Sequence, residues 1–164
     1  MSTQTDGVVA LAPGTGLPIT GAGTGPGSEL IVKALEADTH GAYSLLEWRS
    51  ERGGAWVPPH IHQAEEEAWY VLEGELTFRI GDRTIPAPAG SFILVPRGTL
   101  HSFANTGAGP ARYLQLFSPG GMERYFAERA ALLRDAAPGP PDRAVLTDLN
   151  RRYGMEFVES RRTS

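Results

Sequence analysis

Residues 54–74 read GAWVPPHIHQAEEEAWYVLEG, and the centre of this stretch determines how the rest of the chain is interpreted. In an extended strand, successive side chains alternate between two faces, so His60 and His62 project from the same face. Three acids follow directly, at positions 65–67. Two imidazoles beside carboxylates are either a surface coincidence or half of a metal site, and residues elsewhere in the chain have to distinguish the two.

The composition of the chain excludes several classes of protein. Its 164 residues suit one domain with a single core. A net charge of -4, without a basic stripe to neutralise phosphates, argues against nucleic-acid binding. The absence of cysteine excludes disulfides and thiolate metal sites. The N-terminus resembles neither a signal peptide nor an anchor, and no segment approaches the roughly 20 apolar residues of a membrane span. We therefore expect a cytoplasmic protein that does not bind membranes.

Turn signals divide most of the chain into an arm and a β region. Residues 1–28 are rich in glycine and proline and are expected to form a flexible arm. Within it, 8–11 is a short extended candidate for docking on a sheet edge or on a partner subunit. Residues 29–118 contain short runs of β-forming residues between glycines and prolines, with a tight hairpin signal at Gly81-Asp82. Many short strands at close spacing predict an all-β sandwich or barrel.

The C-terminal part, residues 119–164, changes to a helical period. An apolar stripe predicts a helix over 122–135, and a second stripe predicts another over 142–153. After these we expect a short extended segment at 155–158 and a frayed tail at 159–164.

Two longer motifs contain and extend the histidine pair. From Gly54 to Gly74 the spacing is G-x5-H-x-H-x4-E-x6-G, and from Gly90 to Asn105 it is G-x5-P-x-G-x2-H-x3-N. In this order and at this separation they resemble the two signature motifs of the cupin superfamily, over about residues 30–118. The resemblance implies an all-β fold, a single jelly-roll cupin β-barrel, here with a two-helix C-terminal appendage and a Gly-rich N-terminal arm.

The cupin resemblance also implies a metal site inside the barrel. The ligands would be His60, His62 and Glu67 from the first motif and His101 from the second. Nitrogen and oxygen ligands without sulfur suit one divalent transition metal, with Fe, Mn, Ni, Cu, Co and Zn all open. The motif permits Glu66 or Glu67 as the carboxylate. The spacing to the glycine that ends the motif favours Glu67, and Glu66 remains the alternative.

Four aromatic residues are candidates to surround the ion. If they face an open cavity, the site suits an apolar or aromatic ligand. The four are Trp56, Trp69, Phe92 and Phe103, and Leu94 is an alternative to Phe92. The other interpretation is that they are ordinary core aromatics.

Within the cupins, the chain looks most like the small single-domain quercetin-dioxygenase-like group. Besides the motifs, the segments ADTHGAYSLLEW (37–48) and SPGGMERYFAE (118–128) carry this resemblance. It implies a metal-dependent dioxygenase acting on a small enolisable or aromatic, flavonol-like compound, with Glu67 as ligand and general base. Two alternatives remain open: a non-redox metal-dependent isomerase, cyclase or decarboxylase of secondary metabolism, and a non-catalytic small-molecule-binding cupin. Cupins of this size usually pair through their sheets, so a homodimer is expected.

Overall fold

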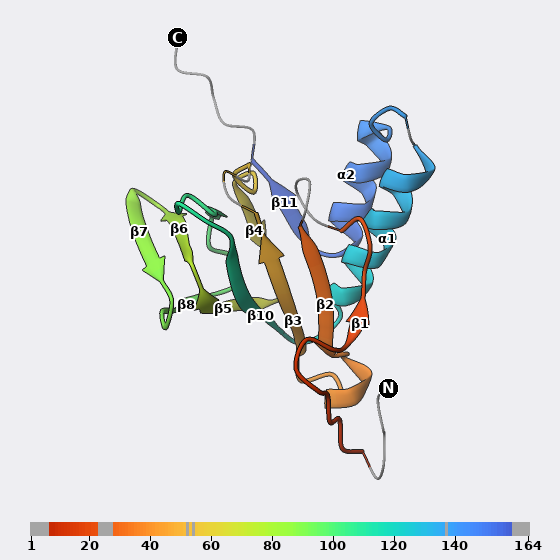
Figure 1. Cartoon of the computed structure of the whole chain (residues 1–164). Coiled ribbons are helices and arrows are strands. Elements are labelled where there is room, and N and C mark those ends of the chain that lie inside the picture. The colour runs from red at the N-terminus through yellow and green to blue at the C-terminus, as the bar shows by residue number, and fades with distance from the viewer. Residues whose placement is uncertain (1–6, 23–27, 52, 54, 137, 159–164) are drawn as a thin grey trace.

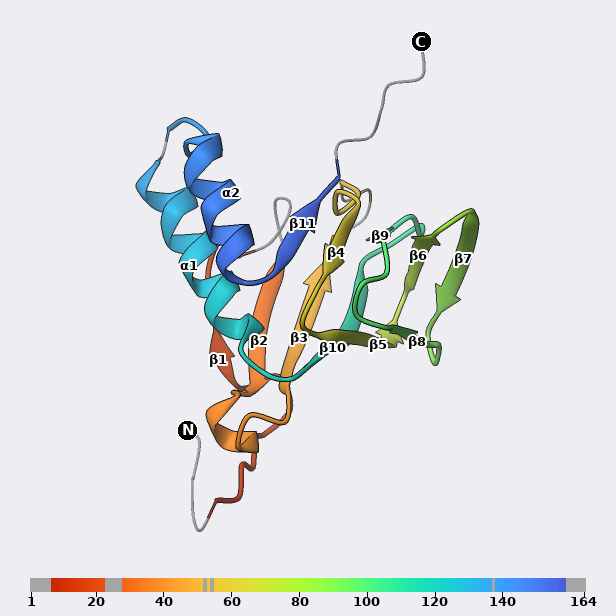
Figure 2. The same cartoon turned by 180° about the vertical axis from the view of Figure 1, so that it is seen from behind.

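Two antiparallel sheets facing each other make up most of the molecule (Figures 1 and 2). The computed structural model describes residues 7–22, 28–51, 53, 55–136 and 138–158. Two helices pack beside the edge strands of both sheets, on the side where the sheets would otherwise be open to solvent. Neither of these described helices has the length and apolar character that crossing a membrane requires.

The first sheet has six strands in the order β1-β2-β3-β10-β5-β8. Every neighbouring pair in it is antiparallel. The strands are β1 (Leu17–Pro18), β2 (Glu29–Ala34), β3 (Ser44–Ser50), β5 (Glu66–Glu73), β8 (Phe92–Val95) and β10 (Ala111–Ser118).

The second sheet has five strands in the order β11-β4-β9-β6-β7. The β6–β7 hairpin pairs Ile80 with Arg83, which confirms the tight turn predicted at Gly81-Asp82, and Gly81 has a positive φ of 56° there. The strands are β4 (His60–His62), β6 (Glu75–Ile80), β7 (Arg83–Pro88), β9 (His101–Ala104) and β11 (Met155–Phe157).

The β region is therefore an open sandwich. The predicted all-β jelly-roll fold is confirmed; in the described part of the chain it takes the form of two packed sheets whose strand pairings stay within one sheet or the other, without hydrogen-bonded closure. Apolar side chains from both inner faces fill the space between them, and burying each contributes roughly 1.5–3 kcal/mol. The largest fully buried ones are Trp69, Phe78, Phe117, Leu46 and Leu76.

The two helices form where the sequence predicts them. Helix α1 spans Met122–Asp135, and α2 spans Arg143–Arg152. The side chain of Asp142 caps α2 by accepting a hydrogen bond from the backbone N–H of Ala144, at 2.8 Å. A short 3-10 helix, η1 (Ala37–Thr39), joins β2 to β3. Both helix predictions are confirmed, and so is the extended segment after them, which is β11.

The start of α1 is fastened to the first sheet by a buried acid. Glu123 is 5% exposed, and it accepts hydrogen bonds from the hydroxyl of Ser44 and from the backbone N–H groups of Glu36 and Gly121. A buried carboxylate requires such donors, because burial without them costs several kcal/mol. These contacts hold α1 against β3, where the cavity described below lies.

The N-terminal arm pairs with the edge of the first sheet at Leu17 and Pro18, which lie opposite Val32 and Ile31 of β2. In the predicted docking segment Val8 is 60% exposed, and docking of that segment on a partner subunit stays a prediction. The predicted flexibility of the arm and fraying of the tail fall partly on 1–6, 23–27 and 159–164, which lie outside the described residues.

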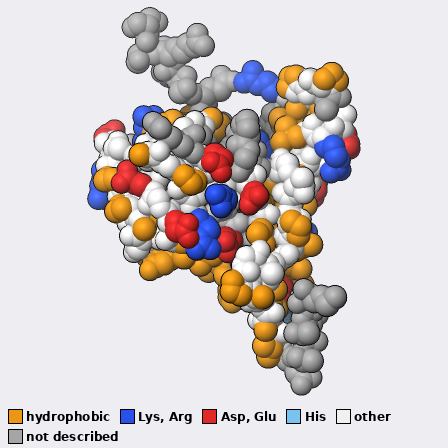
Figure 3. Space-filling view, in the orientation of Figure 1, with side chains coloured by type: hydrophobic (Ala, Val, Ile, Leu, Met, Phe, Trp, Pro, Cys, Tyr) orange, Lys and Arg blue, Asp and Glu red, His pale blue; other side chains and the backbone are white. Residues whose placement is uncertain are grey.

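The outer face of the six-stranded sheet carries linked ion pairs, and Figure 3 shows acidic and basic side chains interspersed on this side of the molecule. Glu47 lies 2.9 Å from Lys33 and 3.3 Å from Arg112, which in turn lies 2.7 Å from Glu73. The exposed pair between Arg112 and Glu73 contributes little stability. Together these pairs make the part of the outer face over β2, β3 and β10 polar.

Candidate metal centre

Four ionisable side chains converge between the two sheets. The ligand atoms of His60, His62, Glu67 and His101 all lie within 4.8 Å of one another, and all four residues are buried. The histidines come from β4 and β9 of the second sheet, and Glu67 comes from β5 of the first. Sheet packing therefore assembles the cluster from segments about forty residues apart in the sequence.

Strand geometry sets the positions of the three imidazoles. His60 and His62 occupy the same face of β4, as their spacing predicts, and His60 is directly opposite His101 on β9. The imidazole centroids of His60 and His101 are 4.3 Å apart. Glu67 closes the cluster from the opposite sheet, with Oε2 at 2.9 Å from His101 Nε2 and 3.2 Å from His62 Nε2.

Backbone carbonyls orient two of the rings. His60 Nδ1 donates to the carbonyl of Pro58 at 2.8 Å, and His101 Nδ1 donates to the carbonyl of Thr99 at 3.0 Å. With the proton held on Nδ1, the neutral ring presents an unprotonated Nε2 to the centre, as a metal ligand must. His62 Nδ1 lies 3.6 Å from Glu65 Oε2, which places an acid beside the third ring.

Alternation along β5 decides between the two candidate acids. Glu67 is 1% exposed and points inward. The side chain of Glu66 is 47% exposed and lies 3.7 Å from Arg97 on the outside. The structure therefore brings Glu67, and not Glu66, to the three histidines.

Gln115 is a member of the centre that the sequence reasoning missed. Its buried side-chain amide, on β10, donates a hydrogen bond to Glu67 Oε1, while Oε2 faces the histidines. The signal for it lay in β10 itself. Ala111, Tyr113, Gln115 and Phe117 alternate inward there, and a polar residue in an inward series indicates a function.

Burial and neighbouring charges set the proton affinities of the cluster. Burial lowers the pKa of His60 to about 4. Burial acts in the same direction on His62, but the carboxylates of Glu67 and Glu65 outweigh it and raise the pKa of His62 to about 9. Burial opposes ionisation of Glu67, but His62 and His101 outweigh it and hold the pKa of that carboxyl well below its usual range. Glu67 is thus an anion that needs a cation beside it.

These four residues fit a divalent transition ion. Three imidazoles and one carboxylate form an N/O donor set without sulfur, buried and already mutually close. In the metal-free protein a proton on His62 supplies the positive charge that Glu67 requires, and an ion would take the place of that proton. The same donor set serves several ions, so it does not name one.

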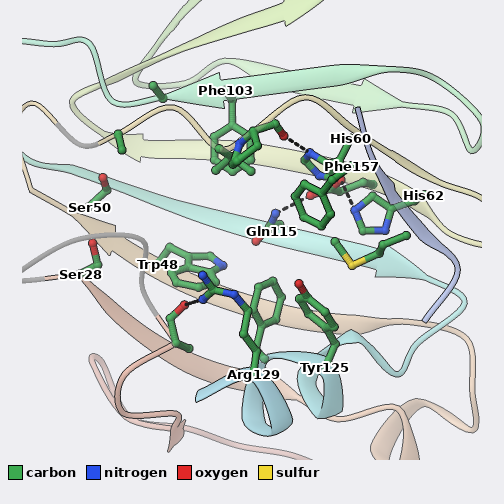
Figure 4. Close-up of a pocket in the computed structure, with 18 of the residues that line it drawn as sticks. Ser28, Trp48, Ser50, His60, His62, Phe103, Gln115, Tyr125, Arg129 and Phe157 are labelled. Atoms are coloured by element: carbon green, nitrogen blue, oxygen red, sulfur yellow. Dashed lines mark hydrogen bonds and ion pairs between the residues drawn. The ribbon is translucent and has the colours of Figure 1, made fainter. Parts of the chain in front are cut away.

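A cavity of about 260 Å³ opens from the ligand cluster and runs between the sheets toward the helices (Figure 4). Its size is just below the roughly 300–1,000 Å³ of most small-molecule pockets. His60, His62 and Glu67 line one end. The walls are mainly aromatic, and the aromatic residues that line it are Trp48, Phe103, Tyr113, Phe117, Tyr125, Phe126 and Phe157.

Of the four aromatic residues proposed for the pocket, only Phe103 lines it. Trp69 is fully buried behind the ligands, with its ring centroid 5.6 Å from that of His101, because second-sheet side chains cover it. Trp56 lies under the guanidinium of Arg79, at 3.8 Å. The inward alternation assumed for Trp56 does not apply, because β4 begins only at His60.

Phe92 is also placed outside the pocket. It is opposite Tyr70 in the β5–β8 pairing, and these side chains are 62% and 45% exposed on the outer face. Leu94, the alternative to Phe92, has the same parity and is 52% exposed. The prediction was wrong because the inward residues of β8 are the other pair, of which Val95 is 2% exposed.

Several cavity-lining side chains come from parts of the chain outside both motifs. Trp48 on β3 and Tyr125, Phe126 and Arg129 on α1 lie opposite the ligands, whereas Phe157 on β11 lies beside them. Phe157 stacks on His60, with ring centroids 5.3 Å apart, because β11 pairs with β4 in a register that places the two opposite each other.

Comparison with known proteins identifies the β region. The Cupin domain family model matches residues 47–117, which include all four converging side chains. The chain is 29% identical over 72 residues to quercetin 2,3-dioxygenase of Bacillus subtilis, a match that covers 44% of this chain and 21% of that protein. It is 34% identical over 68 residues to polyketide synthase CurC of Streptomyces cyaneus, covering 42% and 44%.

The structure gives a concordant result. It resembles the polyketide cyclase RemF from Streptomyces resistomycificus with a TM-score of 0.50 and 27% identity, over 58% of this chain and 67% of that one. The chain spans less than half the length of the curated relatives it matches. Residues 47–117 thus match the Cupin domain family, and the proteins that the chain resembles include a dioxygenase and a cyclase.

Proposed function

We propose that this cupin is a metal-dependent enzyme, a dioxygenase acting on a small enolisable or aromatic, flavonol-like compound. The observation that carries the proposal is the continuity of the ligand cluster with an aromatic-lined cavity. A purely structural metal site is closed by its ligands, whereas a catalytic site leaves positions open to substrate. Here His60, His62 and Glu67 border the cavity itself.

The side chains at this centre would have distinct roles. His60, His62, Glu67 and His101 would hold the ion, which polarises a substrate oxygen when bound. Glu67 Oε2 accepts the proton of the enol or phenol, because it is a buried carboxylate at the mouth of the cavity. Gln115 holds the other oxygen of Glu67 and thereby keeps Oε2 directed at the centre. The aromatic walls orient a planar substrate and exclude water.

A second candidate is a non-redox metal-dependent cyclase, isomerase or decarboxylase. The likeness to the polyketide cyclase RemF supports it, since the same donor set and cavity would also suit an aromatic substrate that is cyclised without oxygen. A non-catalytic binding cupin would retain the same cavity and bind without turnover.

Metal content and oxygen uptake separate these functions. Protein purified without a metal-affinity tag is analysed by elemental mass spectrometry, with His101→Ala as the matched variant. A near-stoichiometric redox-active metal, lost in the variant, together with oxygen consumption on adding flavonols, supports the dioxygenase. Metal with substrate turnover but no oxygen consumption supports the non-redox enzyme, and protein that takes up no metal contradicts both.

The assembly and location remain predictions. A homodimer is checked by light scattering at working concentration, where a monomeric mass contradicts it. The cytoplasmic location is checked by fractionation of the source cells.

A further inference from the structure

Trp48 places an unused hydrogen-bond donor in the cavity wall. The residue is 6% exposed on β3 and lines the cavity. Its indole Nε1 is fully buried and has no hydrogen-bond partner in the described part of the chain. Buried N–H groups in native proteins are nearly always satisfied, and an exception requires an explanation. A ligand oxygen in the cavity would satisfy this one.

Arg129 brings a positive charge to the same wall. It projects from α1 into the cavity, and Nη1 donates to the carbonyl of Ala22 at 3.1 Å. Among the described residues no carboxylate forms an ion pair with it, whereas Arg112 and Arg152 are both paired. A guanidinium has five N–H donors in a planar fork, so most of its donors are available to a ligand.

The two donors lie together and away from the metal centre. Figure 4 shows the guanidinium of Arg129 beside the indole of Trp48, on the side of the cavity opposite His60 and His62. Aromatic side chains line the space between these two ends, and the ring of Phe126 lies edge-on to that of Trp48 at 5.2 Å. The cavity therefore has polar groups at both ends, with aromatic side chains and the amide of Gln115 between them.

We infer that Trp48 and Arg129 form a second oxygen-binding site, which selects planar aromatic ligands with an anionic oxygen, a carboxylate or phenolate, at the end remote from the metal. The inference rests on the proposed function for the role of the metal end, and it narrows the substrate class. A charge-assisted bond from a guanidinium to an anionic oxygen is stronger than a neutral one, especially away from water. A neutral aromatic ligand would cover the guanidinium of Arg129 without offering an anionic oxygen to its positive charge.

A structural role for the same residues predicts a different result. If Arg129 only anchors Ala22 and Trp48 only packs on Phe126, their replacement changes stability but not the preference for one ligand charge over another. The selectivity between a charged and a neutral ligand of equal shape therefore tests the site.

The test measures binding of 2-naphthoate and of its neutral isostere 2-naphthamide to metal-free protein by isothermal titration calorimetry. Wild type is expected to bind the carboxylate more tightly. Arg129→Met is expected to weaken carboxylate binding by about tenfold or more, and Trp48→Phe, which keeps a ring but removes the N–H, by about two- to tenfold. Both variants should weaken binding of the amide less than binding of the carboxylate, because the neutral carbonyl oxygen of the amide forms weaker hydrogen bonds than an anionic oxygen does. Arg134→Met, on the exposed end of the same helix, is the matched control.

Equal binding of the two naphthalene compounds by wild type overturns the inference, and so does an Arg129→Met variant that retains the full preference. If Arg129→Met does not fold, as judged by its thermal melt, Trp48→Phe and Arg129→Gln carry the same comparison.

Metal uptake by the same variants, measured separately by elemental mass spectrometry after incubation with a divalent transition metal and removal of the excess, keeps the two proposals apart. Arg129→Met is expected to take up metal as wild type does. Carboxylate preference in a protein that binds no metal supports the second site and contradicts the metal enzyme. Metal uptake without carboxylate preference contradicts the second site alone.

Discussion

The two ends of the cavity are built in opposite ways. The metal end consists of charged groups that neutralise one another, on strands whose residues lie within two short motifs. The far wall has a buried donor without a hydrogen-bond partner and a cation without a carboxylate partner among the described residues, and it comes from β3 and α1. Under the two proposals above, this difference would place metal binding and ligand selection on separate parts of the chain.

The largest effect should follow loss of a ligand at the metal end. His101→Ala removes one of four donors and leaves Glu67 without its 2.9 Å partner. Because loss of even an outer-sphere partner typically weakens metal binding about 10- to 100-fold, we expect a loss of at least 100-fold. Competition with a chromogenic chelator measures it. His40→Ala, an exposed histidine outside both motifs, is the control, and an equal loss there contradicts the assignment.

The second effect is a pH dependence of the metal-free protein. The pKa of His62 is raised to about 9 from an unfolded value near 6.5, so its protonation stabilises the folded state below pH 6.5. That stability, up to about 3 kcal/mol, is lost as the pH rises through 9. His60, with a pKa of about 4, stays neutral throughout this window. The melting temperature should therefore fall between pH 6.5 and 9.

Glu67→Gln provides the control for this pH dependence, because it removes the charge that raises the pKa of His62. The variant should show a flatter profile over the same window. A wild-type melting temperature that does not change between pH 6.5 and 9 would contradict a stabilising interaction between protonated His62 and the carboxylate of Glu67.

A smaller effect is expected at Gln115, which contacts Glu67 and also lines the cavity. Gln115→Leu keeps the volume but removes the donor, so metal affinity should fall about 10- to 100-fold. Gln115→Glu is a useful companion, since a second carboxylate would repel Glu67. Unchanged metal affinity in Gln115→Leu would show that Gln115 does not support the metal ligands and only lines the cavity.

The smallest effect is expected at the neighbour of the ligand acid. Glu66 is adjacent to Glu67 in sequence but faces outward toward Arg97, 3.7 Å away. Glu66→Gln should therefore change metal affinity by less than about twofold, since an exposed pair contributes roughly 1 kcal/mol at most. A large loss of metal affinity in Glu66→Gln would show that Glu66 takes part in metal binding although it faces outward on β5.

Prediction from the sequence succeeded for features that depend only on residues close together in the chain. The alternation of His60 and His62, the apolar stripe of α1 and the cap at Asp142 depend on neighbours within a few residues, and the structure contains all three. It failed where the ends of strands had to be known. Trp56 precedes β4 and Phe92 has the outward parity of β8, so both were assigned to a pocket that they do not reach.

By itself, the sequence supplied the candidate donors of this protein. The resemblance of its two motifs to those of the cupins implies three histidines and a glutamate, and it left Glu66 open beside Glu67. Only the tertiary structure decided what those donors face. Trp48, Gln115, Arg129 and Phe157 reach the cavity because sheets pair and a helix packs across an open edge. Contacts between residues so distant in sequence leave no periodic signal, since they depend on how whole elements bury their apolar faces together.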